Sequence, residues 1–308
     1  MNYSLVTYRE GGSTRLGALL DNDHTNGNGA TPVPGRLVAP PELKRWSSML
    51  ELLENWPEAS ATLADLPLEA SPLVENGELL APVMPRKVLC AGVNYGKHAM
   101  EMGSVMPDAD WQPFFFLKPP STTVTGPADA IVIRDAERAR YDWEAELAVV
   151  IGAGGRDIPV GEAFAHVAGY CVANDVTARG YHRRESVPAE PFRYDWLAAK
   201  AADTSLPLGP GITPASLVPD PQDLRLRLWV NGELQQDEST ADMICGVDQL
   251  VATASSYVTL EPGDVIATGT PSGVGASRGL HLRHGDVVTV AIDGLGQISN
   301  RVVDAERS

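Results

Sequence analysis

The segment from Tyr141 to Gly152 places two acidic residues, Glu144 and Glu146, at the start of an apolar, β-branched run. This run, residues 147–151, predicts a buried strand. Side chains alternate along a strand, so the two glutamates point to the same face and lie about 7 Å apart. At the entrance of a buried strand, two carboxylates repel each other and lose hydration. A nearby positive group must therefore offset this cost.

The simplest such group is a divalent cation bound through oxygen atoms. Taken alone, a Glu-x-Glu pair is more often a solvated strand end, so the choice depends on other residues. Asp175 ends a second apolar run, residues 168–174, and by itself is better explained as the N-cap of the segment that starts at Val176. Beside Glu144 and Glu146, however, it provides a third ligand. Three carboxylates leave positions open for water and substrate on Mg²⁺ or Mn²⁺, with Ca²⁺ as an alternative occupant.

The composition restricts the partners of the chain. Its 308 residues, 44% hydrophobic and 21% charged, are sufficient for one large domain or two modest ones. The formal net charge of −16 argues against a nucleic-acid partner, which needs clustered Lys and Arg, and against docking on an anionic membrane. A small anionic substrate remains compatible with this charge where a cation or a buried lysine reverses the local field.

The cysteines and the first residues predict a cytoplasmic protein. Cys90, Cys171 and Cys245 are far apart and form no Cys-x-x-Cys motif, so we expect core thiols in a reducing compartment. The first ten residues have neither a basic n-region nor an apolar h-region, which does not fit a signal peptide. No stretch reaches 18 apolar residues, so a transmembrane helix is not expected.

The N-terminal part, residues 1–85, predicts a small α/β domain. Strands are expected at residues 3–8 and 14–20, on either side of a turn at 10–13. Residues 21–35 are rich in Asn, Gly and Pro and predict a long loop. Apolar residues at helical spacing predict a helix over residues 41–53 and a second, short helix at 59–63. Pro82 and Pro85 mark the expected boundary, at about residue 85.

Residues 86–308 predict a strand-rich catalytic domain. Asn231-Gly232 is a strong hairpin signal, and Asp293-Gly294 predicts a further turn. Helices do not alternate regularly with strands, which argues against a doubly wound parallel sheet. We therefore predict an α+β, β-rich fold with a mixed β-roll or sandwich. Strands are expected at residues 87–92, 114–118, 130–133, 147–151, 167–174, 224–231, 264–268 and 286–292, and helices at 94–102, 161–167 and 248–258.

A histidine and two lysines are further candidates for chemistry. His98 and Glu101 are three residues apart on an expected helix and therefore share one face. A glutamate that holds one imidazole nitrogen raises the basicity of the other, which provides a general base near neutral pH. By spacing alone, an exposed helix pair is the commoner explanation. Lys118 and Lys200 lie among apolar residues, where each either faces an anion or, as is simpler for each alone, extends to solvent.

A glycine-rich loop from Thr268 to Gly275 follows an expected strand. Its backbone N–H groups and hydroxyls could bind a carboxylate. It is not a Walker loop, because no Gly-Lys-Ser/Thr follows. It is not a dinucleotide fingerprint either. Residues 152–155 are also rich in glycine and are expected to form a turn. His281 and His284 precede a strand, and we expect both at the surface.

In combination, these segments resemble the fumarylacetoacetate hydrolase family from about residue 87 to the C-terminus. Seven blocks occur in the family's order, which makes the resemblance specific. The N-terminal part looks like the smaller, variable domain of the family's longer, bacterial-type members. The blocks are Gly92-Val-Asn-Tyr-Gly-Lys-His98, Phe116-Leu-Lys-Pro-Pro, Glu144-Ala-Glu146-Leu, Asn174-Asp-Val-Thr-Ala-Arg179, Lys200, Leu260-Glu-Pro-Gly-Asp-Val-Ile266 and Thr268-Gly-Thr-Pro-Ser-Gly-Val-Gly275.

The resemblance implies a mixed β-sandwich roll, usually a homodimer, with a Mg²⁺ or Mn²⁺ site. It also implies a catalytic His–Glu pair on a mobile lid and a catalytic lysine after the metal aspartate. An arginine, a loop threonine and the lysine of the Phe-Leu-Lys-Pro block are implied as substrate-binding residues. In this sequence these positions are the metal ligands Glu144, Glu146 and Asp175, the catalytic residues His98, Glu101 and Lys200, and the substrate-binding residues Arg179, Thr270 and Lys118.

Two positions depart from the family's pattern. Close relatives often carry Gln three residues after the arginine, where it helps to orient the substrate, whereas this chain has His182. We expect His182 to add a hydrogen-bond donor to the substrate site, and its presence leaves the identity of the substrate open. Lys200 is followed by Ala-Ala-Asp where Gly-Phe-Asp or a similar run is common.

The implied activity is hydrolytic cleavage of a carbon–carbon bond in a diketo acid or acylpyruvate. His98, oriented by Glu101, would deprotonate water, and the metal with Lys200 would stabilise the enolate that leaves. Decarboxylation of a 2-oxo diacid such as oxaloacetate, or isomerisation of an oxo acid, is the alternative on the same site. A non-catalytic protein that binds a 2-oxo acid is a third possibility, which the intact acidic and His–Glu residues argue against.

Overall fold

The computed structural model describes residues 2–20, 35–106 and 111–306. Eleven strands of this part form one large sheet, five form a second sheet, and β9 (Tyr141–Asp142) pairs with β12 (Thr177–Ala178). The large sheet runs in the order β3 (Arg36–Val38), β2 (Ser13–Leu20), β1 (Tyr3–Glu10), β13 (Leu206–Pro214), β11 (Val167–Asn174), β10 (Ala145–Ile151), β16 (Val265–Ala267), β5 (Val88–Gly92) and β6 (Phe114–Lys118), with β4 (Glu78–Leu79) on β1 and β7 (Val124–Thr125) on β13.

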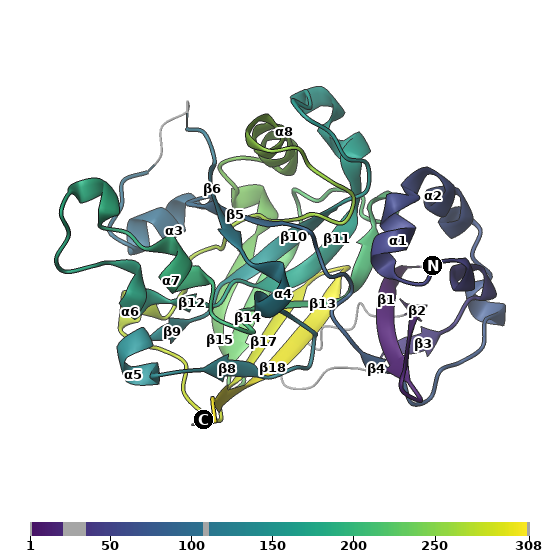
Figure 1. Cartoon of the computed structure of the whole chain (residues 1–308), viewed down its shortest axis with the longest axis horizontal. Helices are drawn as coiled ribbons and strands as arrows, with labels where there is room; N and C mark the ends of the chain where they lie inside the picture. Colours follow the sequence, from purple (N-terminus) through teal and green to yellow (C-terminus); the bar gives the residue numbers. More distant parts are fainter. Residues whose placement is uncertain (1, 21–34, 107–110, 307–308) are drawn as a thin grey trace.

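The second sheet packs against the middle of the first (Figure 1). Its order is β15 (Glu233–Ser239), β14 (Arg225–Val230), β17 (Val287–Ile292), β18 (Gly296–Asp304) and β8 (Ile131–Ile133). The described helices are α1 (Met49–Glu54), α2 (Trp56–Ala64), α3 (Gly96–Glu101), α4 (Pro120–Thr123), α5 (Ala136–Ala139), α6 (Arg179–His182), α7 (Trp196–Lys200) and α8 (Val247–Tyr257). The predicted α+β, β-rich fold class is confirmed.

Strand β10 is buried on both faces, which explains its unbroken apolar sequence. Leu147 and Val149 belong to the apolar cluster shared with the second sheet and α8. Ala148 and Val150 belong to the cluster shared with helices α1 and α2. Alternation along the strand therefore separates two cores, one on each side of the large sheet.

The N-terminal part continues the large sheet and covers one of its faces. Strand β1 pairs antiparallel with β13, with Leu5 opposite Ile212. A methyl group on Gly152 would lie 2.8 Å from Cδ1 of Trp56, so only glycine allows α2 to approach the end of β10 this closely. In Figure 1, α1 and α2 lie beside the N-terminal strands at one end of the molecule. The domain boundary near residue 85 stays a prediction.

Most predicted elements are found, with two differences in the helices. The predicted helix over 41–53 is wrong as one element: a 3₁₀ turn, η1 (Pro41–Arg45), is followed by extended backbone at Trp46 and by α1. The Ser48 side chain accepts a hydrogen bond from the Glu51 N–H and so begins α1 later. The segment at 161–167 is a 3₁₀ helix, η3 (Val160–His166). Of the loop predicted over 21–35, residues 21–34 lie outside the described residues.

Both predicted turns at Asn-Gly and Asp-Gly lie between paired strands, β14–β15 and β17–β18. The three cysteines are buried free thiols, as expected for core residues. Among the described helices, none has the length and apolar character needed to cross a bilayer.

We predict that Leu52→Ala lowers the free energy of unfolding by about 2–5 kcal/mol, because truncation of a fully buried leucine leaves a cavity. Urea denaturation measures this loss. The matched variant Leu73→Ala, at a leucine that is 57% exposed, should change the free energy by less than about 0.5 kcal/mol. Equal losses in the two variants would contradict a core shared between α1 and the large sheet.

Candidate active site

Three carboxylates converge where β10 begins and β11 ends. The two strands are antiparallel, with Ala145 opposite Asn174, so Glu144 and Glu146 lie beside Asp175. The Asp175 N–H donates to the Glu144 carbonyl at 2.9 Å, which fixes this corner of the backbone. All three side chains are buried, and one oxygen from each lies within 4.8 Å of the others. The predicted acidic triad is therefore assembled in space.

Two buried lysines hold this triad. Lys200 Nζ donates to Glu144 Oε2 at 2.7 Å and to Asp175 Oδ2 at 2.6 Å. Lys118 Nζ donates to Asp175 Oδ1 at 2.5 Å and to the Val176 carbonyl at 3.0 Å. Extension to solvent, the simpler explanation for either lysine alone, is wrong because both side chains are almost completely buried. Lys118 lies against Asp175 and is not among the residues that line the cavity, so direct substrate contact by Lys118 stays a prediction.

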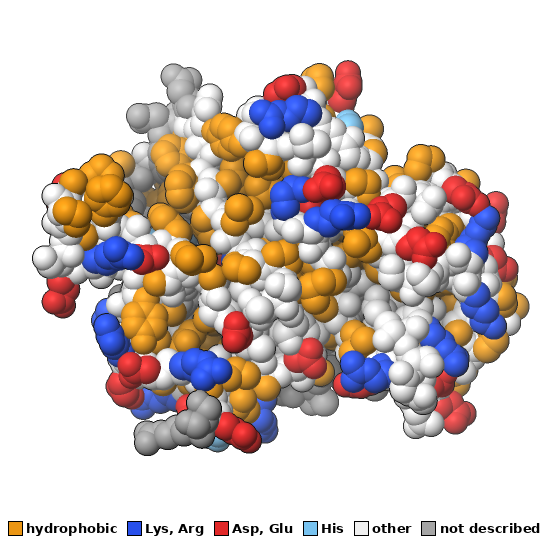
Figure 2. Space-filling model, viewed as in Figure 1, with side chains coloured by type: hydrophobic (Ala, Val, Ile, Leu, Met, Phe, Trp, Pro, Cys, Tyr) orange, Lys and Arg blue, Asp and Glu red, His pale blue; other side chains and the backbone are white. Residues whose placement is uncertain are grey.

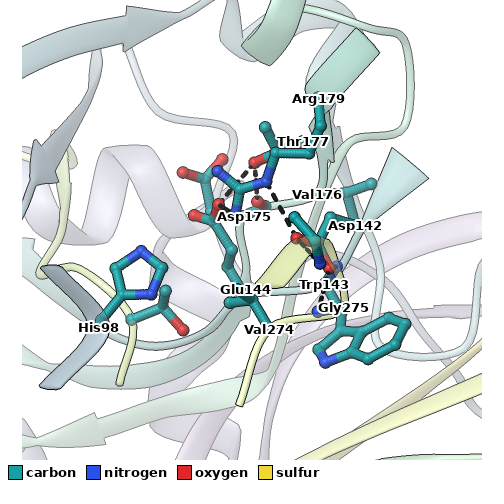
Figure 3. Close-up of polar contacts among 12 residues, drawn as sticks. His98, Asp142, Trp143, Glu144, Asp175, Val176, Thr177, Arg179, Val274 and Gly275 are labelled. Carbon is teal, nitrogen blue, oxygen red and sulfur yellow. Dashed lines mark hydrogen bonds and ion pairs between the residues drawn. The ribbon is translucent and has the colours of Figure 1, made fainter. Parts of the chain in front are cut away.

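Arg179 links Glu144 to a fourth buried acid, Asp142 (Figure 3). Its Nη2 donates to Glu144 Oε1 at 2.6 Å, and its Nε donates to Asp142 Oδ2 at 2.9 Å. The Thr177 hydroxyl also donates to Glu144 Oε1, at 2.8 Å. Arg179 lines the cavity, and its guanidinium orients acidic side chains. Substrate contact by Arg179 stays a prediction.

The charges around Glu144 and Lys200 stabilise each other. Burial by itself raises the pKa of Glu144, but the positive charges of Lys200 and Arg179 outweigh burial and hold this pKa well below its usual range. Burial likewise lowers the pKa of Lys200, but Asp175 and Glu144 outweigh it and raise this pKa. Both groups therefore stay charged at neutral pH.

Glu146 is the carboxylate that lacks such a partner. It accepts the Gly269 N–H at 2.8 Å, but no lysine or arginine of the described residues forms an ion pair with it. Burial raises the pKa of Glu146 well above its usual range, and the charges of Asp175 and Glu144 raise it further. A divalent cation among the three oxygens would offset this cost, so the donor set fits such an ion.

The predicted pairing of His98 with Glu101 also forms. His98 Nδ1 lies 2.8 Å from Glu101 Oε1, and Figure 3 shows His98 across Glu144 from Asp142 and Trp143. Glu101 in turn accepts the Gly273 N–H, at 3.1 and 3.0 Å to its two oxygens, and the Ser277 hydroxyl at 3.2 Å. Helix α3 is thereby attached to the glycine-rich loop.

The glycine-rich loop binds carboxylates of the protein itself. Gly269 donates to Glu146, Gly273 to Glu101, and Gly275 to Asp142 at 2.7 Å. The loop was expected to bind a carboxylate of the substrate through such groups, and in this structure these three N–H groups are already in use. Within the loop, Thr270 lines the cavity, and its hydroxyl accepts a hydrogen bond from Gln236 at 2.9 Å.

One cavity of about 560 Å³ brings most of the predicted residues together. His182 contributes an imidazole that packs against Trp196, with ring centroids 4.4 Å apart. Its buried Nε2 has no hydrogen-bond partner among the described residues. Burial, and then the charges of Arg179 and Lys200, lower the pKa of His182. The predicted residues on the cavity wall are His98, Glu144, Glu146, Arg179, His182, Lys200 and Thr270.

Sequence reasoning missed Asp142, Gln236 and the cavity-lining Arg140 and Arg183, and it expected His281 at the surface. Asp142 continues the alternation of Glu144 and Glu146, so the same argument could have found it. Gln236 comes from a distant strand, where no local pattern marks it; it joins the Ala145 N–H, at 2.9 Å, to Thr270. The expectation that His281 is a surface residue is wrong, because its side chain is only 14% exposed and lines the cavity.

We predict that two neutral replacements differ in their effect on the stability of the metal-free protein. Glu144→Gln should lower the free energy of unfolding by about 3 kcal/mol, because it removes one of the two buried carboxylates that Lys200 and Arg179 each hold. Glu146→Gln should cause no loss, because it removes a buried charge that has no cationic partner in the described residues. Chemical denaturation after chelation measures both.

The same variants test the metal site. Mg²⁺ at a hundred times its dissociation constant should stabilise the unmodified protein by about 2.7 kcal/mol. Neither variant should gain this stabilisation at the same concentration. A full Mg²⁺ effect in Glu146→Gln would contradict Glu146 as a ligand.

Comparison with known proteins agrees with this arrangement. Residues 87–303 match the family model described as "Fumarylacetoacetate (FAA) hydrolase C-terminal". "Oxaloacetate tautomerase fahd2, mitochondrial" of Xenopus laevis is 44% identical over 231 residues, which are 74% of this chain and 69% of that protein. "Oxaloacetate tautomerase YisK" of Bacillus subtilis is 40% identical over 223 residues, 72% of this chain and 71% of that protein.

A solved structure extends the similarity to the N-terminal part. The fumarylacetoacetate hydrolase from psychrophilic Exiguobacterium antarcticum matches with a TM-score of 0.80 at 33% identity, over 98% of this chain and 100% of that chain. The family model covers more than half of the sequence and includes every residue of the acidic triad. The chain belongs to the fumarylacetoacetate hydrolase family.

Proposed function

We propose that this protein interconverts the keto and enol forms of a 2-oxo diacid of the oxaloacetate type. The observation that carries the proposal is that His98, held by Glu101, lines one cavity with Glu144 and Glu146 of the buried acidic triad. Two relatives at 44% and 40% identity are named oxaloacetate tautomerases. These observations support the isomerase alternative better than the carbon–carbon hydrolase that we expected first from the sequence.

The reaction needs one proton to move from carbon to oxygen, with no net gain of water. Glu101 holds Nδ1 of His98, so Nε2 is the nitrogen available to take the proton from the carbon beside the oxo group and to deliver it to the oxo oxygen, with the two transfers reversed for ketonisation. When bound by Glu144, Glu146 and Asp175, Mg²⁺ or Mn²⁺ supplies Lewis-acid polarisation of a substrate oxygen. Lys200 and Arg179 keep the carboxylates ionised and oriented for that ion.

Hydrolysis of an acylpyruvate remains the second candidate. It would use the same His98 to deprotonate water, and the similar structure from Exiguobacterium antarcticum is named as a hydrolase. Decarboxylation of the same diacid is a further branch of the chemistry. The three reactions differ in their products: an isomer of equal mass, two acids, or carbon dioxide and a shorter oxo acid.

We predict that the protein with Mg²⁺ or Mn²⁺ accelerates the keto–enol equilibration of oxaloacetate, followed by the ultraviolet absorbance of the enol. Mass spectrometry of the same mixture should show no change of mass beyond the uncatalysed background. Catalysed release of carbon dioxide would identify a decarboxylase instead, and cleavage of acylpyruvates without tautomerisation would identify a hydrolase.

We predict that His98→Ala lowers turnover by a factor of about 10²–10⁴, the usual contribution of one positioned acid–base group. Because His98 is not one of the three proposed metal ligands, the stabilisation by Mg²⁺ should stay unchanged in a thermal-shift measurement. The Glu101→Gln variant should lose less activity than His98→Ala, because His98 Nε2 is still present to transfer the proton. Unchanged turnover in His98→Ala would refute this assignment.

We also propose that the protein forms the homodimer implied by the resemblance. Figure 2 shows hydrophobic side chains gathered over the region where β6 and α7 lie in Figure 1. Phe114 and Leu117 of β6 and Leu197 of α7 are exposed there, and the rings of Phe114 and Trp196 lie 5.1 Å apart. An exposed apolar surface beside an edge strand supports association with a second copy.

A further inference from the structure

We infer that the cavity contains a second anion subsite, formed by Arg140, Arg183 and His281, which binds the distal carboxylate of a dicarboxylate substrate. All three residues line the same cavity as His98 and Glu146. The inference rests on the proposed function for the role of the other carboxylate, but its residues are separate from the acidic triad.

Two arginines leave positive charge at this cavity without an acidic partner among the described residues. Arg179 and Lys200 are neutralised by the acids they hold. Arg140 and Arg183 also line the cavity, yet among the described residues neither side chain forms an ion pair. Within a chain of net charge −16, two unpaired arginines at one cavity form a local positive region, which favours an anion.

Two other arginines of the Arg183 segment, by contrast, have acidic partners. Arg184 pairs with Asp195, and Arg193 pairs with Glu190. Both lie in the same segment as Arg183, but neither lines the cavity. Within this segment, the two arginines that do not line the cavity form ion pairs, whereas Arg183, which lines it, forms none among the described residues.

The three residues come from segments that meet at β9. The Leu282 N–H donates to the Tyr141 carbonyl at 2.7 Å, which places His281 next to Arg140. The Arg179 N–H donates to the Arg140 carbonyl at 3.3 Å, which brings the start of α6 to the same place. Arg183 directly follows α6.

His281 supplies a second, independent observation. Its Nε2 is buried and has no hydrogen-bond partner among the described residues. The closest approach to an acid that the structure gives is 3.9 Å, to Glu137 Oε1, which is too long for a hydrogen bond. A buried nitrogen beside a cavity costs free energy unless a ligand or solvent satisfies it.

The backbone of Arg140 has an unusual conformation. Arg140 ends α5 in the left-handed region, with φ of 49°. Glycine or asparagine occupies this position at lower cost, because a larger side chain strains the backbone there. This strained residue at the end of α5 is one that lines the cavity.

The guanidinium groups of the subsite are suited to a carboxylate. A guanidinium donates two parallel hydrogen bonds to a carboxylate, which gives both affinity and orientation. With the oxo-acid end of the substrate at the acidic triad, the arginine region would hold a carboxylate at the other end. The subsite therefore favours a 2-oxo diacid over a 2-oxo monoacid of equal length.

Matched ligand pairs test this inference. Binding in the presence of Mg²⁺ is measured for oxaloacetate against 2-oxobutanoate, and for 2-oxoglutarate against 2-oxopentanoate. The proteins are the unmodified chain, Arg140→Gln, Arg183→Gln and the double variant. Arg283→Gln is the control, since Arg283 lies two residues from His281, is exposed and does not line the cavity.

We predict that the unmodified protein binds the preferred diacid more tightly than its paired monoacid. Each single variant should weaken diacid binding about tenfold, as expected for loss of charge-assisted hydrogen bonds, and leave monoacid binding within about twofold. Arg283→Gln should change neither.

Three results would overturn the subsite: equal binding of diacid and monoacid by the unmodified protein, equal weakening of both ligands in the arginine variants, or the same loss in Arg283→Gln. Failure of the proposed function looks different. Arginine-dependent diacid binding without tautomerisation would support the subsite and refute the activity, whereas tautomerisation with unchanged diacid binding in both variants would support the activity and refute the subsite.

Discussion

A buried set of opposite charges at the junction of β10 and β11 determines how the rest of this site is built. Ionised acids in a protein interior are costly unless each meets a cation or several donors. Lys200 and Arg179 provide that compensation for Glu144, and Lys118 and Lys200 provide it for Asp175. Among the described residues, Glu146 accepts a hydrogen bond only from the Gly269 N–H. A hard cation bound by the three carboxylates would provide the compensation that Glu146 lacks.

The glycine-rich loop connects this charged centre to the base. Its N–H groups bind Glu146, Asp142 and Glu101, so one loop fixes a proposed ligand, the acid behind Arg179 and the partner of His98. Gly273 has φ of 102°, and a methyl group there would lie 2.1 Å from the Gln235 carbonyl oxygen. Glycine is therefore required at the point where the loop passes β15 and reaches α3.

We expect the choice of substrate to depend on the cavity residues outside the acidic triad and the His98–Glu101 pair. The triad and the His98–Glu101 pair suit enolate formation in tautomerisation, decarboxylation or hydrolysis alike. His182, Arg140, Arg183 and His281 lie on the wall and would decide which oxo acid is held, and in which orientation. Substrate choice is therefore expected to vary through these residues while the acids stay the same.

The sequence by itself determined the strands, the same-face alternation of Glu144 and Glu146, the spacing of His98 and Glu101, and the fold class, because these follow from local periodicity and turn chemistry. Only the tertiary structure decided that Lys118 and Lys200 turn inward, that Gln236 supports Thr270, that the glycine-rich loop binds protein carboxylates, and that His281 joins Arg140 at the cavity. These contacts join residues far apart in the chain, and burial and charge compensation between them exist only once the sheets have packed.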